Sequence, residues 1–475
     1  MKNHLRLITG ITGVLFFTII SCSQPDENGE INPFEEYLSD VHPSYSYELE
    51  ETFEDDNYTA YVLRMVSQEW LTDAEVNQTE WWHWVTIVVP DSVAHQTGML
   101  WIGGGDVDTK PAETLNPLVV QAALATNSVA THLHNVPFQP ISFKNDASFD
   151  ERSEDEIIAY GWRKYLEGGA NPEDAEWLAR LPMTAAAQRA MDTVSDFTAN
   201  QELARVDSFV IGGASKRGWT TWTTAIFDDR VVAITPAVID LLNLSPSFMH
   251  HWRGYGEWSP AIEDYENENI MNWQFTEEYN TMVDLIDPYS YLDRTTMPKY
   301  LINAASDEFF LPDSWQFYWR DLQGEKHLRY VPNTGHDIGE TDAPASLISF
   351  YDMILDKTPR PEFIWSADST GFNLEFDPDN LPDELLLWNA QNPEARDFRL
   401  YVIDRIWVAK PIDIPEDGIV NVDITTPEEG FSAWFVEATY SSGYELPFKT
   451  TTGVVVTPDR YPFEEFVPDT SVVSE

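Results

Sequence analysis

Short apolar runs alternate with helical patterns from Tyr58 to about Leu355, and this alternation constrains the fold more than any other feature. Continuous apolar runs are typical of strands that helices cover on both faces, as in a mostly parallel sheet. The pattern therefore predicts an α/β domain over residues 45–358. Helices are expected over Glu154–Glu167, Thr184–Asn200, the segment after Ser215, Asp313–Leu322 and Ala345–Asp356. The expected strands are Tyr58–Met65, Trp84–Val89, Met99–Ile102, Ser128–His132, Ser208–Ile211, Val231–Ile234, Lys299–Ala304 and Leu328–Val331.

One of these strands runs into a glycine pair, a serine and a helix, in the stretch VDSFVIGGASKRGWTTW. Hydrolases that carry a serine nucleophile on a strand-to-helix turn share the pattern G-x-S-x-G. Here Gly213 and Ser215 match that pattern, whereas the second glycine is displaced to Gly218. Serine is also a favoured residue at the start of a helix. Taken alone, the motif leaves Ser215 as either a nucleophile or a helix cap.

An acid and a histidine follow two later strands in the order that this class of hydrolase requires, Ser, then Asp or Glu, then His. Asp307 comes just after Lys299–Ala304, and His336 comes just after Leu328–Val331. A serine needs an adjacent base, and the base needs a carboxylate to orient it. The order therefore favours Ser215, Asp307 and His336 as a catalytic triad. Glu308 or Asp313 could replace Asp307, and a histidine in a turn is often a plain surface residue.

The same mechanism needs backbone N–H groups that stabilise the oxyanion. One would come from Lys216, the residue after the serine, and another from the glycine loop after Met99–Ile102. That loop contains Gly103 and Gly104, and its glycines allow a close approach of the backbone.

Residues 243–290 interrupt the alternation with a segment rich in aromatic and acidic residues. An insertion at this point of such a sheet commonly lies over the carboxyl ends of the strands, where ligands bind. Trp252, Tyr255 and Trp258 form no clean helical stripe, so they are expected to line the substrate pocket rather than only a small core of their own.

After Pro359 and Pro361 the hydrophobic period changes to two, with turn signals between the alternating segments. About seven short strands over residues 359–465 predict a β-sandwich of immunoglobulin-like type. Residues 466–475 are expected to form a tail. This region carries no evident chemistry of its own.

The first 22 residues resemble a signal peptide of a bacterial lipoprotein. Lys2 and Arg6 precede a short apolar run, which ends in Ile-Ile-Ser-Cys at Cys22. Cys22 is the chain's single cysteine, and we expect it to be acylated. Residues 23–44 are acidic and proline-bearing, as in a tether. The predicted location is therefore the bacterial cell envelope, at the outer membrane, periplasmic or surface-facing.

The charge of the chain limits its partners. It carries 80 acidic and 28 basic residues, a formal net charge of −52. Nucleic acid and an anionic bilayer surface need clustered basic residues, so neither is an expected partner, and membrane contact would come from the lipid anchor alone. No cofactor is expected. No metal site is expected either, because His132 and His134 are followed by no acid or cysteine at a ligand spacing.

The run G-A-S-K-R-G-W, followed by F-D-D-R-V and T-P-A-V-I-D, resembles the PhoPQ-activated pathogenicity-related protein family. W-W-H-W, S-D-E-F-F-L-P-D and N-T-G-H fit that family too, and its elbow is similar to that of glucuronoyl esterases. The resemblance implies an α/β-hydrolase-type exported protein without a settled substrate. With the triad, it favours Ser215 as nucleophile of an ester or amide hydrolase. Open alternatives are a silent fold that binds a peptide or glycan at the cell surface, and a glucuronoyl-esterase-like carbohydrate esterase.

Lys216 and Arg217 directly follow the serine in a chain that has few basic residues. Each either pairs with a nearby acid such as Asp228 or Asp240, or points into the mouth of the site. In the second case a cation would hold a carboxylate of the substrate, so a uronic ester or an acidic peptide would suit the site. The oligomeric state is not predicted.

Overall fold

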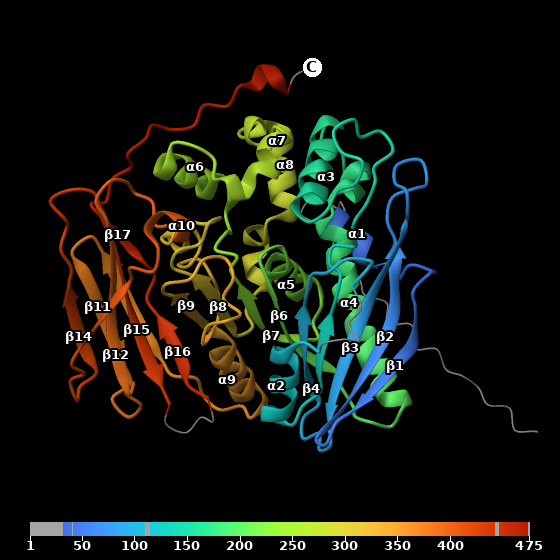
Figure 1. The fold of residues 1–475 in the computed structure, drawn as a ribbon, viewed down its shortest axis with the longest axis horizontal. Helices are drawn as coiled ribbons and strands as arrows, with labels where there is room; N and C mark the ends of the chain where they lie inside the picture. Colours follow the sequence, from blue (N-terminus) through green and yellow to red (C-terminus); the bar gives the residue numbers. More distant parts are fainter. Residues whose placement is uncertain (1–31, 40, 110–114, 442–445, 474–475) are drawn as a thin grey trace, which may run out of the picture.

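The computed structural model describes residues 32–39, 41–109, 115–441 and 446–473. Its centre is a nine-stranded sheet in the order β1-β2-β3-β5-β4-β6-β7-β8-β9 (Figure 1). The strands β5, β4, β6, β7, β8 and β9 are parallel, and β1, β2 and β3 add an antiparallel edge. Their bounds are β1 Ser46–Glu54, β2 Tyr58–Glu69, β3 Glu80–Pro90, β4 Thr97–Ile102, β5 Ala130–Leu133, β6 Ser208–Ala214, β7 Val231–Ala237, β8 Lys299–Ala304 and β9 Lys326–Val331.

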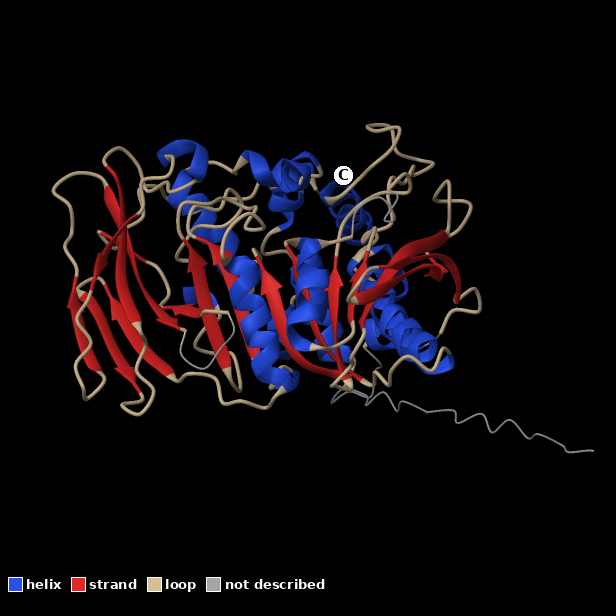
Figure 2. Cartoon of the chain, turned by 60° about the horizontal axis from the view of Figure 1, so that its bottom comes forward, coloured by secondary structure: helices blue, strands red, loops and turns tan. Residues whose placement is uncertain are grey.

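Helices cover both faces of this sheet, as Figure 2 shows. On one face α4 (Arg180–Asn200) packs against α5 (Lys216–Phe227) and β2, with the short α1 (Pro33–Ser39) beside α4. On the other face lie α2 (Pro117–Thr126) and α9 (Ala343–Leu355). Neighbouring residues of one strand therefore enter different cores, Ile211 the first and Val210 the second. The predicted architecture, a mostly parallel sheet with helices on both faces, is confirmed.

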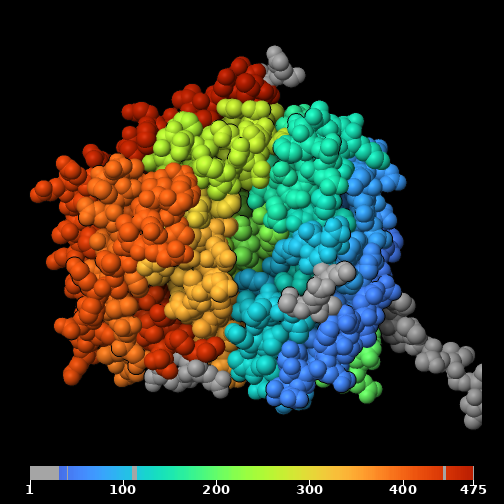
Figure 3. Space-filling view, in the orientation of Figure 1, coloured from blue at the N-terminus to red at the C-terminus, as the bar shows by residue number. Residues whose placement is uncertain are grey.

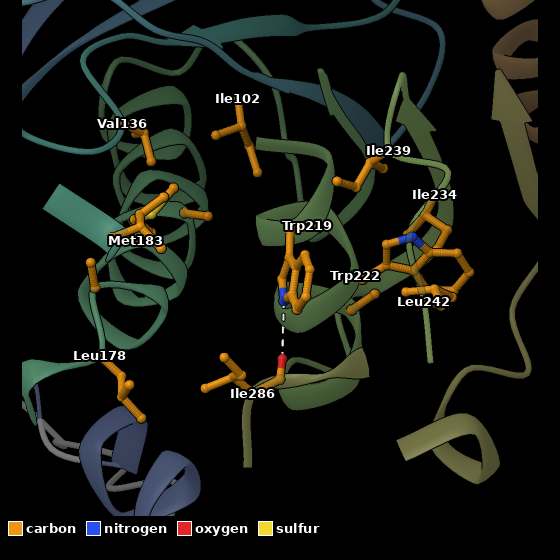
Figure 4. Close-up of a cluster of buried hydrophobic side chains, with 14 of the residues drawn as sticks. Ile102, Val136, Leu178, Met183, Trp219, Trp222, Ile234, Ile239, Leu242 and Ile286 are labelled. Atoms are coloured by element: carbon orange, nitrogen blue, oxygen red, sulfur yellow. Dashed lines mark hydrogen bonds between the residues drawn. The ribbon is translucent and has the colours of Figure 1, made fainter. Parts of the chain in front are cut away.

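The helix α5 is fixed to the core beneath it by two tryptophans on one face. Trp219 and Trp222 are fully buried, and Figure 4 shows them among aliphatic side chains from β4, β7 and α4. The indole N–H of Trp219 donates a hydrogen bond of 3.0 Å to the carbonyl of Ile286. The first turn of α5, which begins directly after Ser215, is thereby held in one position.

The insertion between β7 and β8 folds as a series of short helices along one end of the sheet (Figure 1). Together with α3 (Asp155–Glu167) it lies near the point where β6 ends, because residues from both line a cavity beside Ser215. Its helices are α6 Leu244–Tyr255, a 3-10 turn at Pro260–Ile262, α7 Glu263–Asn267, a 3-10 turn at Ile270–Trp273 and α8 Glu277–Ile286.

The carboxyl-terminal region forms two antiparallel sheets that are consistent with a sandwich domain. One has the order β10-β11-β14 and the other β13-β12-β15-β16, with β17 also paired to β15. A short helix, α10, spans Leu400–Ile403. The strands are β10 Phe363–Asp368, β11 Gly371–Phe376, β12 Glu384–Asn392, β13 Val408–Pro411, β14 Ile419–Asp423, β15 Phe431–Tyr440, β16 Phe448–Thr451 and β17 Val455–Thr457.

The sandwich and the central sheet share a core rather than meeting only at a linker. The N–H of Tyr330 in β9 donates to the Thr451 hydroxyl at 3.0 Å, and the Thr450 hydroxyl donates to the Leu328 carbonyl at 3.1 Å. The ring of Phe448 lies 5.2 Å from that of Tyr300 in β8. The edge strand β16 therefore packs directly against β9.

Several predicted elements differ from the structure. The expected tether, residues 23–44, includes α1, whose Phe34 is fully buried against the core. The helix expected over Asp313–Leu322 is only a 3-10 turn at Ser314–Phe317 followed by turns. The leader and Cys22 lie outside the described residues. Among the helices that are described, none is both long and apolar enough to cross a bilayer.

Candidate active site

Ser215 occupies a sharp turn between β6 and α5. Its backbone has φ 57° and ψ −126°, a conformation that non-glycine residues rarely adopt and that is found at functional sites. Its side chain makes no capping hydrogen bond to the helix and instead lines a cavity. The helix-cap reading of Ser215 therefore has no support in the geometry.

Two glycines allow this turn to be so tight. A Cβ on Gly213 would lie 2.7 Å from the Arg217 carbonyl oxygen. A Cβ on Gly218 would lie 2.7 Å from the Cγ2 of Ile239 and 3.0 Å from the Gly213 oxygen. The glycine that is displaced from the usual motif thus serves the close approach of α5 to β6 and β7.

Asp307 and His336 form a pair in the loops that follow β8 and β9. The Nδ1 of His336 lies 2.9 Å from Asp307 Oδ2, and the Asp307 carboxylate is buried. The N–H of Phe309 donates to Asp307 Oδ1 at 2.8 Å, and the N–H of His336 donates to Glu308 Oε2 at 2.7 Å. The imidazole also packs against the Phe309 ring, at 4.2 Å between centroids.

This arrangement separates the roles of the two ring nitrogens of His336. Its Nδ1 faces a carboxylate, which favours a proton on that nitrogen. Its Nε2 has no hydrogen-bond partner among the described residues. Glu308, the alternative acid, accepts from backbone instead, and Asp313 pairs with His250 and Arg396. Of the three acids, only Asp307 holds the His336 ring.

A cavity of about 50 Å³ lies beside Ser215, between α5, α3 and the insertion. In Figure 3 a hollow between the yellow-orange and teal parts of the surface exposes green atoms, the colour of the segment that contains β6 and α5. The polar lining of the cavity includes Lys216, Asp155, Arg180 and His251. Its apolar walls are Trp162, Trp219, Ile239, Leu241, Phe248, Ile262, Phe309, Phe310 and Leu311.

The aromatic residues that were predicted to line this pocket lie elsewhere. The Trp252 and Trp258 rings pack against each other at 5.1 Å and against Phe466 of the carboxyl-terminal tail at 4.8 and 5.0 Å. Tyr255 lies under the Arg399 guanidinium at 4.1 Å. Phe248 and His251, one turn earlier on α6, line the cavity instead. The insertion lines the site, but through other residues than the sequence suggested.

Lys216 and Arg217 are neutralised by acids at the start of α3, not by Asp228 or Asp240. The Nζ of Lys216 lies 2.7 Å from Glu154 Oε2 and 2.8 Å from Asp155 Oδ2. Arg217 pairs with the other oxygen of Glu154. Burial would raise the pKa of Glu154, but the charges of Arg217 and Lys216 outweigh it and lower that pKa to about 2.

Asp228 and Asp240, the acids considered as partners, have other contacts. Asp228 pairs with Arg230. Asp240 is buried after β7 and accepts hydrogen bonds from the hydroxyls of Tyr318 and Tyr330. Burial raises its pKa to about 7, despite those hydrogen bonds.

The glycine loop after β4 lies against Arg217, which pairs with Glu154. The N–H of Gly103 donates to the Leu133 carbonyl at 2.7 Å, so it is already used by the backbone and is a poor oxyanion donor. A Cβ on Gly103 would also meet the His132 ring at 2.1 Å, and one on Gly104 would meet the Arg217 guanidinium at 2.8 Å. Gly104 and Lys216 remain the candidates for backbone donors.

No group of three or more acidic, histidine or cysteine side chains is gathered as metal ligands within the described ranges. The rings of His132 and His134 instead lie against each other, with their centroids 3.7 Å apart and their planes tilted by 46°. His134 is buried, and this burial lowers its pKa to about 4.

Sequence reasoning missed the acids and aromatics that complete the site. Glu154, Asp155, Phe248 and Tyr265 were not singled out, although all contact Lys216 or line the cavity. The acidic pair at the start of a predicted helix was the available signal, but such pairs are common at helix starts.

Comparison with known proteins places the chain in a family. It is 35% identical over 458 residues to "Autocrine proliferation repressor protein A" of Dictyostelium discoideum, which covers 91% of each chain. Acetyl xylan esterase 1 from Thermoanaerobacterium sp. JW/SL YS485 aligns with 13% identity and a TM-score of 0.46, over 71% of this chain and 96% of that one. A glucuronoyl esterase from Solibacter usitatus aligns with 13% identity and a TM-score of 0.36, over 69% and 95%. The family model of the PhoPQ-activated pathogenicity-related protein matches residues 34–399, and the chain belongs to that family.

Proposed function

We propose that this protein is a serine hydrolase that cleaves an ester by acyl transfer through Ser215. The observation that carries the proposal is the Asp307–His336 pair, whose Nε2 has no partner among the described residues, in a fold that presents Ser215 on a strained turn. A serine that is used neither as a cap nor as a structural hydroxyl fits a nucleophile.

In the proposed reaction the Oγ of Ser215 attacks the carbonyl carbon of the substrate, and His336 Nε2 takes its proton. The tetrahedral oxyanion is stabilised by the backbone N–H of Lys216 and by the Gly104 loop. As the carbon–oxygen bond to the leaving alcohol breaks, His336 returns the proton to that alcohol. Water then attacks the acyl-enzyme with His336 as base, which releases the carboxylic acid and restores Ser215. Asp307 orients the ring and stabilises its cationic form throughout.

Labelling with a fluorophosphonate probe tests this proposal. Wild type should take one label and hydrolyse a chromogenic acetyl ester, and Ser215→Ala should lose both, with turnover reduced by about 10⁴-fold or more. Ser366→Ala is the matched control, because Ser366 is an exposed serine on β10 of the sandwich and should keep both properties. A folded wild type that takes no label would instead favour a hydrolase fold that acts by binding. Equal labelling of Ser215→Ala would exclude Ser215 as the nucleophile.

We also propose that the protein is exported and held at the cell envelope by a lipid on Cys22. The support is the sequence alone: a charged start, a short apolar run and a terminal Ile-Ile-Ser-Cys.

A further inference from the structure

We propose that the cavity beside Ser215 accepts a short, uncharged, apolar group of the substrate and excludes a carboxylate. This inference rests on the proposed hydrolase function and specifies its substrate class. It opposes the expectation, drawn from the two adjacent cations, that the substrate is anionic. The reason lies in the partners that those cations already have.

Of the two cations that line the cavity, Lys216 is neutralised by acids of the protein. Lys216 is buried, and its Nζ lies within 2.8 Å of a carboxylate oxygen from each of Glu154 and Asp155. Arg217 pairs with Glu154 and donates to the Val136 carbonyl, so its guanidinium is also occupied. A substrate carboxylate would have to displace these acids, at the cost of leaving them buried beside it.

Other polar groups of the wall have partners within the protein, although the Nε of Arg180 has none among the described residues. The Tyr265 hydroxyl donates to Asp155 at 2.9 Å. Arg180 donates to the Lys216 carbonyl at 3.0 Å and lies over the Trp219 ring, 4.5 Å from its centroid. His251 accepts from the Ser259 N–H at 3.0 Å, and burial lowers its pKa to about 3, so the ring is neutral.

Burial would raise the pKa of Asp155, but the charges of Lys216 and Arg180 outweigh it and lower that pKa. The carboxylates of Glu154 and Asp155 thus neutralise Lys216 and Arg217, and Asp155 lies close enough to Arg180 for the two charges to interact. A substrate carboxylate would compete with these two acids for all three cations. In a chain with a net charge of −52, the surrounding field repels an anion as well.

The size of the cavity sets a limit on the group that enters it. Its volume is about 50 Å³, and one water-sized group needs roughly 10–15 Å³ by this measure. There is room for about three to five non-hydrogen atoms. Trp162, Trp219, Phe248 and Phe310 form its apolar walls, and these favour carbon over polar atoms.

Two series of chromogenic esters test the inference on the full chain. The first keeps the alcohol and varies the acyl group from acetyl through butyryl to hexanoyl, with succinyl as the charged match of butyryl. The second keeps acetyl and lengthens the alcohol. We expect kcat/KM to fall by about 10-fold or more beyond the size limit in one series, which identifies the side of the ester that enters. Succinyl should be at least about 10-fold slower than butyryl.

Two variants test whether this cavity sets the size limit of the substrate. Phe248→Ala shortens a side chain of the wall and so enlarges the cavity, which should raise the relative rate of the longer esters by about 10-fold. Phe466→Ala is the matched control, because Phe466 packs on Trp252 and Trp258 outside the cavity, and it should leave the preference unchanged.

The outcomes separate the two proposals. Three results would overturn the inference while turnover still depends on Ser215: a preference for succinyl over butyryl, no size limit in either series, or an equal change of preference in both variants. The hydrolase proposal would stand in each case. If neither turnover nor probe labelling depends on Ser215, the hydrolase proposal fails, and the inference fails with it.

Discussion

At the scale of single residues, Gly218, the third residue after the serine, decides how close α5 can come to the sheet. Gly218 is a helix-interior glycine, which ordinarily costs about 0.5–1 kcal/mol relative to alanine. Here the cost is accepted because any Cβ would meet Ile239 at 2.7 Å and two backbone oxygens at 3.0 and 3.2 Å. One of these oxygens, that of Ala237, also accepts a hydrogen bond of 2.8 Å from the Ser215 N–H.

We predict that Gly218→Ala destabilises the protein, against the usual helix preference. Overpacking at this contact should lower the free energy of unfolding by about 1–3 kcal/mol, measured by urea denaturation, and should reduce esterase activity. The control is Gly339→Ala, whose added Cβ would meet only Asp337 Oδ1 at 3.3 Å. A stabilised Gly218→Ala variant would contradict this account of the displaced glycine.

Glu154 gives a prediction about pH. Its pKa is lowered from 4.5 to about 2 in the fold, so the folded state holds fewer protons than the unfolded chain between these values. The stability that it contributes is therefore complete above about pH 4.5 and is lost as the pH falls towards 2. The difference in unfolding free energy between wild type and Glu154→Gln should shrink over that window.

Equilibrium unfolding of both proteins between pH 2 and 7 measures this difference. Glu167→Gln serves as the control, because Glu167 is the last residue of α3 as Glu154 is the residue before its first, and because it pairs with Arg163 at 3.1 Å at a similar side-chain exposure. As a surface pair it should change stability at neutral pH by no more than about 0.5 kcal/mol. A difference for Glu154→Gln that stays constant down to pH 2 would mean that the ion network does not depress its pKa.

At the scale of elements, the loops that carry Asp307 and His336 are held by the sandwich domain. The Trp407 indole donates to the Ser306 hydroxyl at 2.9 Å, and the N–H of Leu400 in α10 donates to the Ser306 carbonyl at 3.0 Å. Asn333 makes two hydrogen bonds with the backbone of Trp407, at 2.9 and 3.0 Å. The sandwich, which carries no chemistry of its own, thus contacts residues adjacent to both.

We predict that Asn333→Gly lowers kcat by about 10-fold and changes KM by less than about two-fold, because it frees the loop before His336 without touching the cavity. Glycine is chosen since Asn333 has φ 58°. Asn389→Ala removes a comparable hydrogen bond, to Ala433 at 3.1 Å, inside the sandwich. If both variants lose stability but neither loses kcat, the contact is structural only.

Sequence and structure agree on the elements whose signal is local. β6, β8 and β9 were predicted from apolar runs, and the order of Ser215, Asp307 and His336 followed from them. What was missed depends on distant partners. The helix α2 was not predicted, because its apolar residues form no clear helical face. In the fold α9 packs against it.

Trp252 and Trp258 look like pocket residues until Phe466, more than 200 positions later, covers them. Lys216 and Arg217 likewise look like free cations because Glu154 and Asp155 lie about 60 residues earlier in the chain. Phe34 of α1 is buried by α4 and the rest of the core, although its neighbours in the sequence are acidic. A single sequence gives the order of elements but not these pairings.

At the scale of the whole molecule, the net charge of −52 bears on how the chain is held at a membrane. An anionic bilayer surface repels such a protein, and membrane attachment by surface charge needs clusters of Lys and Arg. The described helices offer no span either. Attachment, if the lipoprotein interpretation of the leader is right, therefore depends on Cys22 alone.

We predict that wild type, expressed with its leader, is recovered with membranes and that Cys22→Ala is not acylated. Because no described helix is a membrane span and the net charge opposes surface binding, the variant should either stay unprocessed, anchored by its uncleaved apolar run, or be released after cleavage. Mass spectrometry of the mature amino terminus and fractionation at high salt distinguish these states. Ser21→Ala, with the cysteine intact, is the control and should remain acylated. A processed Cys22→Ala protein that stays on membranes in high salt would show that another part of the molecule binds them, and the lipid-anchor proposal would then fail.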